Sequence, residues 1–337
     1  KNKGKKMNSE LVIPEGNKKT LAELVGVSIE LSGSDNNNNK RSKVSTLARL
    51  NLTGKAIMGV KNIEGKDMNL EVIPAGAYEL EQDDGIKVYC INPIIRVLTY
   101  REQWGRFDVE NNKPNKSMMA KGSVFGKVLK DSTGGTNLGR IPNEVCSEFF
   151  DDYWKDRSED YKKRINDVKR HKLLFGTIDF NGKALDEFGM PLKDIEEPIP
   201  FLFDVKNRKS LSEIDKKFNE IEEYSADQLG FPKKDDLRRK AKKAKKLELE
   251  AKCAENLLKS RFTLGSEIHD TGFIWSSVTI EKVQQGDYLD GDIDNLLKFN
   301  EWIEYIDGLT LNLWKENNVE QLSDAQAELV EEFVDVE

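Results

Sequence analysis

The stretch Gly85–Val109, GIKVYCINPIIRVLTYREQWGRFDV, constrains the fold more than any other part of the chain. It is rich in β-branched and aromatic residues, and it lacks the 3.6-residue periodicity of a helix. Proline is tolerated where strands begin, so the stretch predicts one long strand, or two strands that meet near Pro93. A strand of this length would form the centre of a sheet.

The faces of this strand suggest a binding surface. Side chains alternate across a strand, so an unbroken strand from Ile94 groups basic and aromatic side chains on one face. That face would carry Arg96, Tyr100, Trp104 and Arg106, with Leu98 and Glu102 between them. Single-stranded nucleic acid uses such a face, with bases on rings and phosphates on cations. The alternative is that the two aromatic rings pack a core beneath long arginine side chains.

The segments before this stretch predict further strands. Residues 46–60 and 68–82 alternate apolar and polar side chains, are separated by the turn signal EGK, and lead through Asp84-Gly85 into the central stretch. Three consecutive antiparallel strands would result. Such a β-meander is typical of an OB-like barrel or a sandwich.

The rest of the body mixes strands and helices. Apolar patterns predict strands at His171–Phe180, Ile199–Val205 and Gly272–Val283. Helical spacing predicts insertions at 143–169 and 210–260 and a C-terminal helix from Leu296 to Asn317. Inward positions of the first insertion would be Val145, Phe149, Ile165 and Val168, and a capping box of Ser210 and Glu213 would open a helix over 210–224. The predicted class is therefore α+β, mainly antiparallel β with helical insertions.

A glycine- and lysine-rich segment, 111–140, follows the central stretch. Its six basic residues face one acid, Asp131, and are Lys113, Lys116, Lys121, Lys127, Lys130 and Arg140. The sequence TGGTNLGR within it lacks the Lys-Ser/Thr of a Walker loop, which excludes an NTPase of that kind. Its glycines would still let backbone amides approach a phosphate. The segment is either a path for nucleic acid or an ordinary solvated loop.

A second basic run, KKDDLRRKAKKAKK at Lys233–Lys246, holds nine basic residues against two acids. It continues into a sequence typical of a helix. Pairing of Asp235 with Arg239 and of Asp236 with Lys240, each four residues apart, favours a solvated helix face. Direct contact with phosphates is the alternative.

The ends of the chain differ from its body. Residues 1–45 contain a lysine-rich start and SGSDNNNNKRSK, and predict a flexible basic arm with a disordered loop. Residues 316–337 hold eight acids and no Lys or Arg, so the other 315 residues carry a net charge of +1 against −7 for the whole chain. We expect 46–315 to form the β-rich domain, and 316–337 to be a disordered acidic tail that competes with nucleic acid for basic surface.

Catalytic and metal sites find no support in the sequence. His171 and His269 have no cysteine or second histidine at zinc spacing, and no Gly-x-Ser-x-Gly elbow is present. Asp290–Glu301 places acids like an EF-hand loop, but Asn295 stands where the turn needs glycine, and Asp292 or Asp294 is better explained as a helix cap. We therefore expect no enzyme activity, no cofactor and no metal.

The cellular setting follows from cysteine usage and hydropathy. Three scattered cysteines, Cys90, Cys146 and Cys253, argue against disulfides and fit a reducing cytoplasm, that of the host cell if the protein is viral. No apolar run reaches the roughly 18 residues of a membrane helix, and the start lacks the apolar core of a secretory signal. No pattern indicates an oligomeric state.

The aromatic–basic strand, the basic loops and the acidic end together resemble the single-stranded DNA-binding proteins of bacteriophages. The residues that carry the resemblance are Tyr100, Trp104 and the tail from Glu328 to Glu337. The resemblance implies an OB-type domain that binds single-stranded DNA in replication or recombination. It also implies a tail that binds replication proteins through Leu329, Glu331, Glu332, Phe333 and Asp335.

This chain departs from that family in two ways. Its tail ends in Val-Asp-Val-Glu without a terminal aromatic residue, and the chain is longer than a minimal OB domain. A phage structural or assembly protein, whose tail and basic helix make protein contacts, is the main alternative. A nuclease is a third interpretation, since spacing among sixty acids discriminates nothing.

Overall fold

A computed structural model describes residues 47–63, 66–82, 85–141, 157–193, 195 and 198–334, with the backbone alone for 61–63 and 319–334. The predicted arm at 1–45 lies outside these residues, as do Val145 and Phe149 of the predicted insertion at 143–169.

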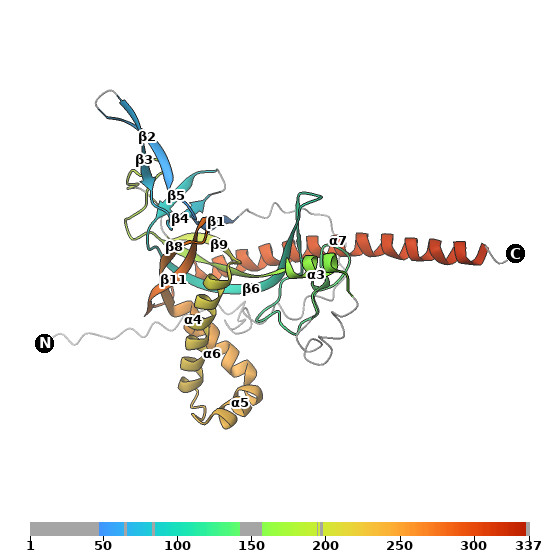
Figure 1. Ribbon diagram of the computed structural model, residues 1–337. Helices are drawn as coiled ribbons and strands as arrows, with labels where there is room; N and C mark the ends of the chain where they lie inside the picture. Colours follow the sequence, from blue (N-terminus) through green and yellow to red (C-terminus); the bar gives the residue numbers. More distant parts are fainter. Residues whose placement is uncertain are drawn as a thin grey trace. The chain divides into compact units, whose positions relative to one another are not determined.

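The central feature is an antiparallel sheet built around one long strand. Its strands are β1 (Ala48–Leu52), β4 (Tyr78–Glu81), β5 (Lys87–Cys90), β6 (Ile94–Asp108), β7 (Lys113–Lys116), β8 (Lys169–Asp179), β9 (Ile199–Val205), β10 (Ser260–Asp270) and β11 (Ile274–Gln285). Their order is β11-β10-β6-β8-β9-β1-β4-β5, with β7 paired to β6, and β1 runs parallel to β9 (Figure 1). The α+β class and the mainly antiparallel sheet are confirmed, and the central stretch forms two strands that meet at Pro93.

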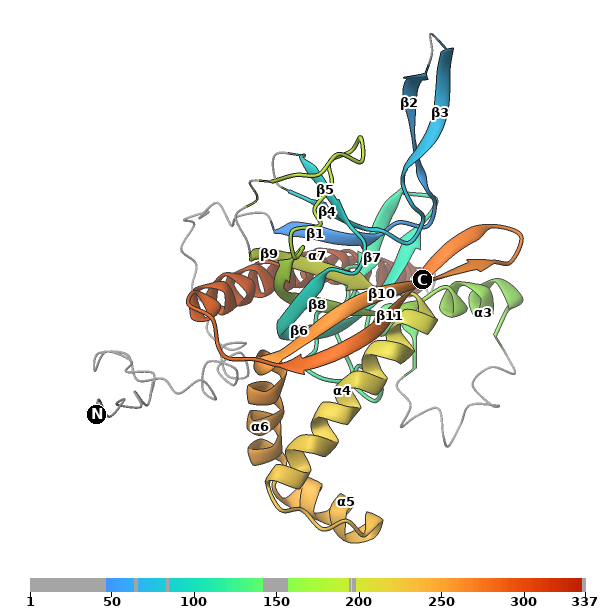
Figure 2. The same ribbon diagram turned by 90° about the vertical axis from the view of Figure 1, so that its left-hand side faces the viewer.

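The expected meander is broken by an inserted hairpin. Strands β2 (Ile57–Ile63) and β3 (Lys66–Ile73) pair with each other and project from the sheet, as Figure 2 shows. A tight turn at Pro74–Ala77, with Gly76 at a φ of 79°, separates β3 from β4, so 68–82 is not one strand. Likewise 46–60 splits into β1 and β2. Strand β1 pairs directly with β4 instead.

We expected an OB-like barrel or a sandwich, and the described strands form an open sheet without barrel closure. The sheet nevertheless bends on itself, because the Tyr78 hydroxyl of β4 donates to the Gly265 carbonyl of β10 at 2.7 Å. The main core fills this inner face and joins strands from both sides of the bend. Leu50, Tyr78, Leu174, Phe203 and Phe262 are buried there.

Five described helices surround the sheet: α3 (Glu159–Asn166), α4 (Arg208–Gln228), α5 (Asp235–Ala244), α6 (Lys246–Lys259) and α7 (Asp292–Val334). Leu211 and Ile214 of α4 enter the inner core beside Leu174, whereas the next residue of β8, Phe175, packs on Phe299 of α7 at 5.6 Å between ring centroids. Helices α4 and α7 therefore cover opposite faces (Figures 1 and 2).

Three helix and strand boundaries differ from the predictions. Helix α4 is capped by the Asn207 side chain, not by Ser210, whose buried hydroxyl accepts from the Val278 N–H at 2.8 Å. The segment after α6 is a strand, β10, which the sequence did not predict, so His269 lies in a strand and not in a loop. Helix α7 continues to Val334, so most of the expected disordered tail is helical.

A β-bulge in β6 overturns the predicted alternation of side chains. Val97 pairs with Gly176 and Thr99 with Phe175, which leaves Leu98 as an extra residue. The two halves of β6 are therefore out of phase. A Cβ on Gly176 would lie 1.8 Å from the Arg96 carbonyl oxygen, so only glycine allows the strands to approach this closely.

Because of the bulge, Arg96 and Tyr100 lie on opposite faces. Arg96 is 4% exposed and makes a two-pronged ion pair with Asp292, the first residue of α7, at 2.8 and 2.7 Å. It also donates to the Leu258 carbonyl at 3.0 Å. Arg96 is thus an anchor for α7 and not part of an exposed binding face.

We expect Asp292→Asn to destabilise the protein by about 3–5 kcal/mol, because it leaves the buried Arg96 charge without its carboxylate. Urea unfolding monitored by circular dichroism measures this. Asp294→Asn is the matched control on the same helical turn; Asp294 is exposed, and its change should stay within about 0.5 kcal/mol. Equal effects of the two substitutions would contradict the anchoring role.

Candidate nucleic-acid interface

Trp104 is a core residue. Its side chain is 3% exposed and packs with Ala120, Val124, Leu138 and Val168 in a second small core beneath residues 117–140. Tyr100 is half-buried against Phe218 of α4, at 5.1 Å between ring centroids. The interpretation of these rings as core residues is confirmed, and an open stacking face formed by them is excluded.

The segment 117–140 is folded, and its glycine-rich part is not an open phosphate cradle. Asp131 is fully buried, and its carboxylate accepts from the N–H groups of Thr133 at 2.9 Å, Gly135 at 3.3 Å and Leu138 at 2.7 Å. The amides that we expected to meet a phosphate are therefore already bonded to this internal anion. The Asn137 side chain supports the same turn by bonding Leu129 N at 2.8 Å.

The predicted cations of this region do not converge. Lys113, Lys127 and Lys130 are exposed, whereas Arg106, Lys116, Lys121 and Arg140 are half-buried. Lys130 lies over the Trp314 ring of α7 at 4.2 Å, and the Lys127 ammonium donates to the Lys121 carbonyl. Only Trp104 and Arg140 of the predicted nucleic-acid-binding residues line the groove described next.

A large groove runs along α4. It has a volume of about 1550 Å³ and is lined by the α4 surface from Arg208 to Asp227 and, among other residues, by Trp104 and Phe125. A rise of 1.5 Å per residue makes that helix side about 28 Å long. This length suits an extended ligand better than a compact one.

Four side chains that line the groove form a stack. The Arg140 guanidinium lies over the Trp104 ring at 4.6 Å, and Trp104 meets Phe125 edge-to-face at 5.3 Å. The Arg170 guanidinium then lies over Phe125 at 5.5 Å. Cations thus flank two rings in contact. Phe125 is 40% exposed, and Gly122 and Gly126 beside it have φ of 76° and 79°, so the sequence presents this ring on a tight turn.

A buried charge network fixes α4 to the sheet beneath the groove. The Lys172 ammonium, 4% exposed, lies 3.2 Å from Glu102 and also bonds Asp215 of α4. Arg170 bonds the same Asp215 carboxylate. Burial raises the pKa of Asp215, but bonds from Lys172 and Arg170 outweigh it and lower the pKa overall. These charges are mutually satisfied and serve to position α4.

Other cations that line the groove are exposed and have no side-chain partner in the described part of the chain. They are Lys169, Lys206, Arg208 and Lys216. The C-terminal part of α4 instead carries acids, of which Glu223 and Asp227 bond Arg238 of α5 at 2.7 and 2.9 Å. Positive charge is therefore concentrated beside the Phe125 stack.

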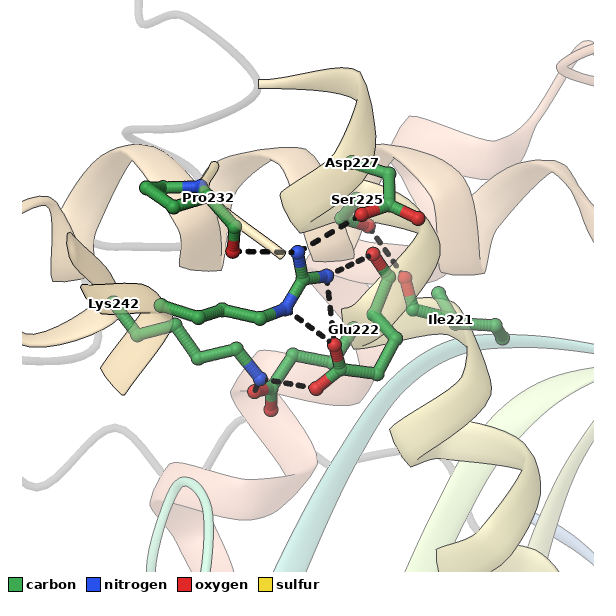
Figure 3. Close-up of polar contacts among 8 residues, drawn as sticks. Ile221, Glu222, Ser225, Asp227, Pro232 and Lys242 are labelled. Atoms are coloured by element: carbon green, nitrogen blue, oxygen red, sulfur yellow. Dashed lines mark hydrogen bonds and ion pairs between the residues drawn. The ribbon is translucent and has the colours of Figure 1, made fainter. Parts of the chain in front are cut away.

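The basic run of α5 is partly used for packing, as Figure 3 shows. Lys242 bonds Glu222 of α4 at 2.7 Å, and Arg238 also donates to the Pro232 carbonyl at 3.4 Å. The predicted pairs at four-residue spacing are not the ones formed; Arg239 bonds Asp236 at 3.0 Å instead. Lys233, Lys234, Lys240 and Lys243 are exposed, which matches the solvated-face interpretation.

In the EF-hand-like segment Asp290–Glu301, one of the acids already takes part in an ion pair. Asp292 binds Arg96 and accepts from the Leu289 N–H at 2.9 Å, so it is not available to a cation. Among the described residues, no group of three or more His, Cys, Asp or Glu side chains could hold a metal ion. The described helices also include none long and apolar enough to cross a membrane.

Comparison with known proteins gives no family: no family model matches the chain, and no curated protein or solved structure matches it either.

Sequence reasoning missed most of the residues that build the groove. Lys169 and Arg170 open β8, Lys206 and Arg208 flank the β9–α4 turn, and Lys216 lies on α4. Nothing in their local sequence indicates that they converge. Phe125 had a signal, because an aromatic residue in the basic sequence KGSVFGK is set between two glycines.

Asp307 should make stability depend on pH. Its carboxylate accepts from the Met119 N–H at 2.7 Å and joins α7 to segment 117–140. Burial raises its pKa from 3.8 to about 6, against the opposing effects of that bond and of Arg101. Below pH 3.8 the group is protonated in both states; above pH 6 it is ionised in both, and the folded state then carries the cost of a buried charge.

We therefore expect Asp307→Asn to gain stability over the parent protein as pH rises from about 4 to about 7.5, by up to about 3 kcal/mol. Urea unfolding of both proteins across this range measures the gain. Glu304→Gln, an exposed position on the same helix, should give no such trend. A difference that is constant with pH would refute the raised pKa.

Proposed function

We propose that this protein binds single-stranded nucleic acid, and single-stranded DNA in particular, in the groove along α4. The observation that supports this most is the exposed Phe125 ring in a stack with Trp104, Arg140 and Arg170, with four exposed cations in the same groove. Bases offer a π-face to an aromatic ring whatever their sequence, and phosphates attract the nearby cations. In this proposal the residue that stacks on a base is Phe125 and not Trp104, because Trp104 is buried.

The biological role that we propose is that of a phage-type protein acting in DNA replication or recombination. The resemblance noted from the sequence supports this role, which does not require a closed barrel; the described strands form an open sheet that the Tyr78–Gly265 bond bends. In this proposal the C-terminal residues Leu329, Glu331, Glu332, Phe333 and Asp335 bind replication proteins; Asp335 lies outside the described residues. In this proposed role the protein has no enzymatic activity.

Phe125→Ala should weaken binding of a fluorescent oligothymidine by about 1–3 kcal/mol, or about 5- to 150-fold, because it removes one stacked base. Fluorescence anisotropy at low salt measures this, with duplex DNA as competitor. Phe188→Ala is the matched control, since Phe188 is equally large, 66% exposed and outside the groove. No binding by the parent protein would instead favour a structural or assembly protein.

Trp104→Ala should act on folding, in contrast to Phe125→Ala. Removing a buried indole leaves a cavity in the second core and should lower the free energy of unfolding by about 3–5 kcal/mol. Thermal and urea unfolding distinguish the two positions. If Trp104→Ala left stability unchanged and lost only binding, the ring would be a stacking residue after all.

The salt dependence of binding should locate the phosphate contacts. Replacing Lys169, Arg208 and Lys216 by Gln should reduce the slope of log K against log salt by about 2–3, close to one unit per lost contact. The same change at Lys234, which precedes α5, and at Lys240 and Lys243 of α5 removes equal charge outside the groove and should leave the slope nearly unchanged. Equal losses in both triple variants would indicate diffuse attraction without a defined path.

A further inference from the structure

A second cavity lies beyond the turn that joins β9 to α4. It has a volume of about 470 Å³ and is lined by Arg49 and Asn51 of β1, Lys116 of β7 and Trp302 of α7. That size falls in the range of ligand pockets, about 300–1000 Å³. Its lining contains polar groups from several elements distant in sequence, which is typical of a binding site.

The cavity has an excess of positive charge. Arg49 and Lys206 are exposed and Lys116 is half-buried, and none has a side-chain hydrogen bond or ion pair within the described ranges. The one carboxylate in the lining, Asp204, is bonded to His171 Nδ1 at 2.8 Å. Burial raises the pKa of Asp204, but His171, Lys116 and Lys206 together lower it, so these cations converge on one place.

The cavity and the α4 groove adjoin each other. Lys206 and Asn207 line both of them. The turn that they form is firmly held, because the Asn207 side chain accepts from Lys209 N at 2.9 Å and Ser210 N at 3.3 Å. The backbone at Lys206 is therefore held in place where the two hollows adjoin, and the exposed Lys206 side chain lines both of them.

We propose that a single strand bound in the α4 groove continues across Lys206 into this cavity, where Arg49 and Lys116 bind its next phosphates. The inference rests on the proposed function and extends it, because the groove alone would bind a shorter strand. One continuous path then explains why unpartnered cations occur on both sides of the β9–α4 turn.

Oligothymidines of increasing length test this, from about 4 to about 16 nucleotides, the range bound by single domains of this kind. The probe is fluorescence anisotropy at several salt concentrations with the full chain. For Arg49→Gln/Lys116→Gln, the salt slope on long strands should fall by about 2 while that on the shortest strands stays at the parent value. Lys66→Gln/Lys282→Gln, an equal charge change outside both hollows, should change neither.

Three outcomes would overturn the inference: an unchanged slope at every length, an equal fall at every length, or the same fall in the control variant. Because Arg49 is exposed, the single variant Arg49→Gln should fold normally, which circular dichroism checks. On long strands, this variant should show half the fall in salt slope of the double variant. If the inference fails but Phe125→Ala still weakens binding, the proposed function stands. If the parent protein does not bind oligothymidine, both the inference and the proposed function fail.

Discussion

The β-bulge at Leu98 determines how the two faces of the sheet are used. Ahead of it, Arg96 points toward α7 and binds Asp292. Beyond it, Tyr100, Glu102 and Trp104 point to the α4 side, where Glu102 meets Lys172. One extra residue thus places Arg96 and Tyr100 on opposite faces, so that Arg96 binds α7 while Tyr100 packs on α4. The charge network and the apolar contacts of Leu211 and Ile214 together hold α4 on the inner face.

The fold was predictable where local pattern decides it and unpredictable where contacts distant in sequence do. Strand β9 has the predicted bounds, and the central stretch was recognised by its β-branched and aromatic residues. The phase of β6 could not be read from its own sequence, because the bulge depends on Gly176 in another strand. Strand β10 was missed because its residues continue directly from α6 without a Gly or Pro signal.

The candidate site, like the fold, was predictable from the sequence only in part. The basic character of segment 111–140 was visible in the sequence, but the buried Asp131 carboxylate, which occupies the amides of the glycine-rich turn, reverses the expected use of those amides. An internal acid and an external phosphate satisfy the same donors, and spacing cannot tell them apart. The cations of the groove come from β8, from the β9–α4 turn and from α4, so only the folded chain brings them together.

The helical state of α7 changes the role expected of the acidic end. Asn317 still contacts the body, since its side chain donates to the Ser132 carbonyl at 2.8 Å. From there to Val334 a continuous helix extends by about 26 Å at 1.5 Å per residue. A flexible tail could fold back onto basic surface, but a helix holds its charges along a line, and attraction falls off over about 8 Å at physiological salt. We therefore expect that α7 must unwind before the acidic end can compete for the groove, so that the free energy of that helical segment opposes the competition.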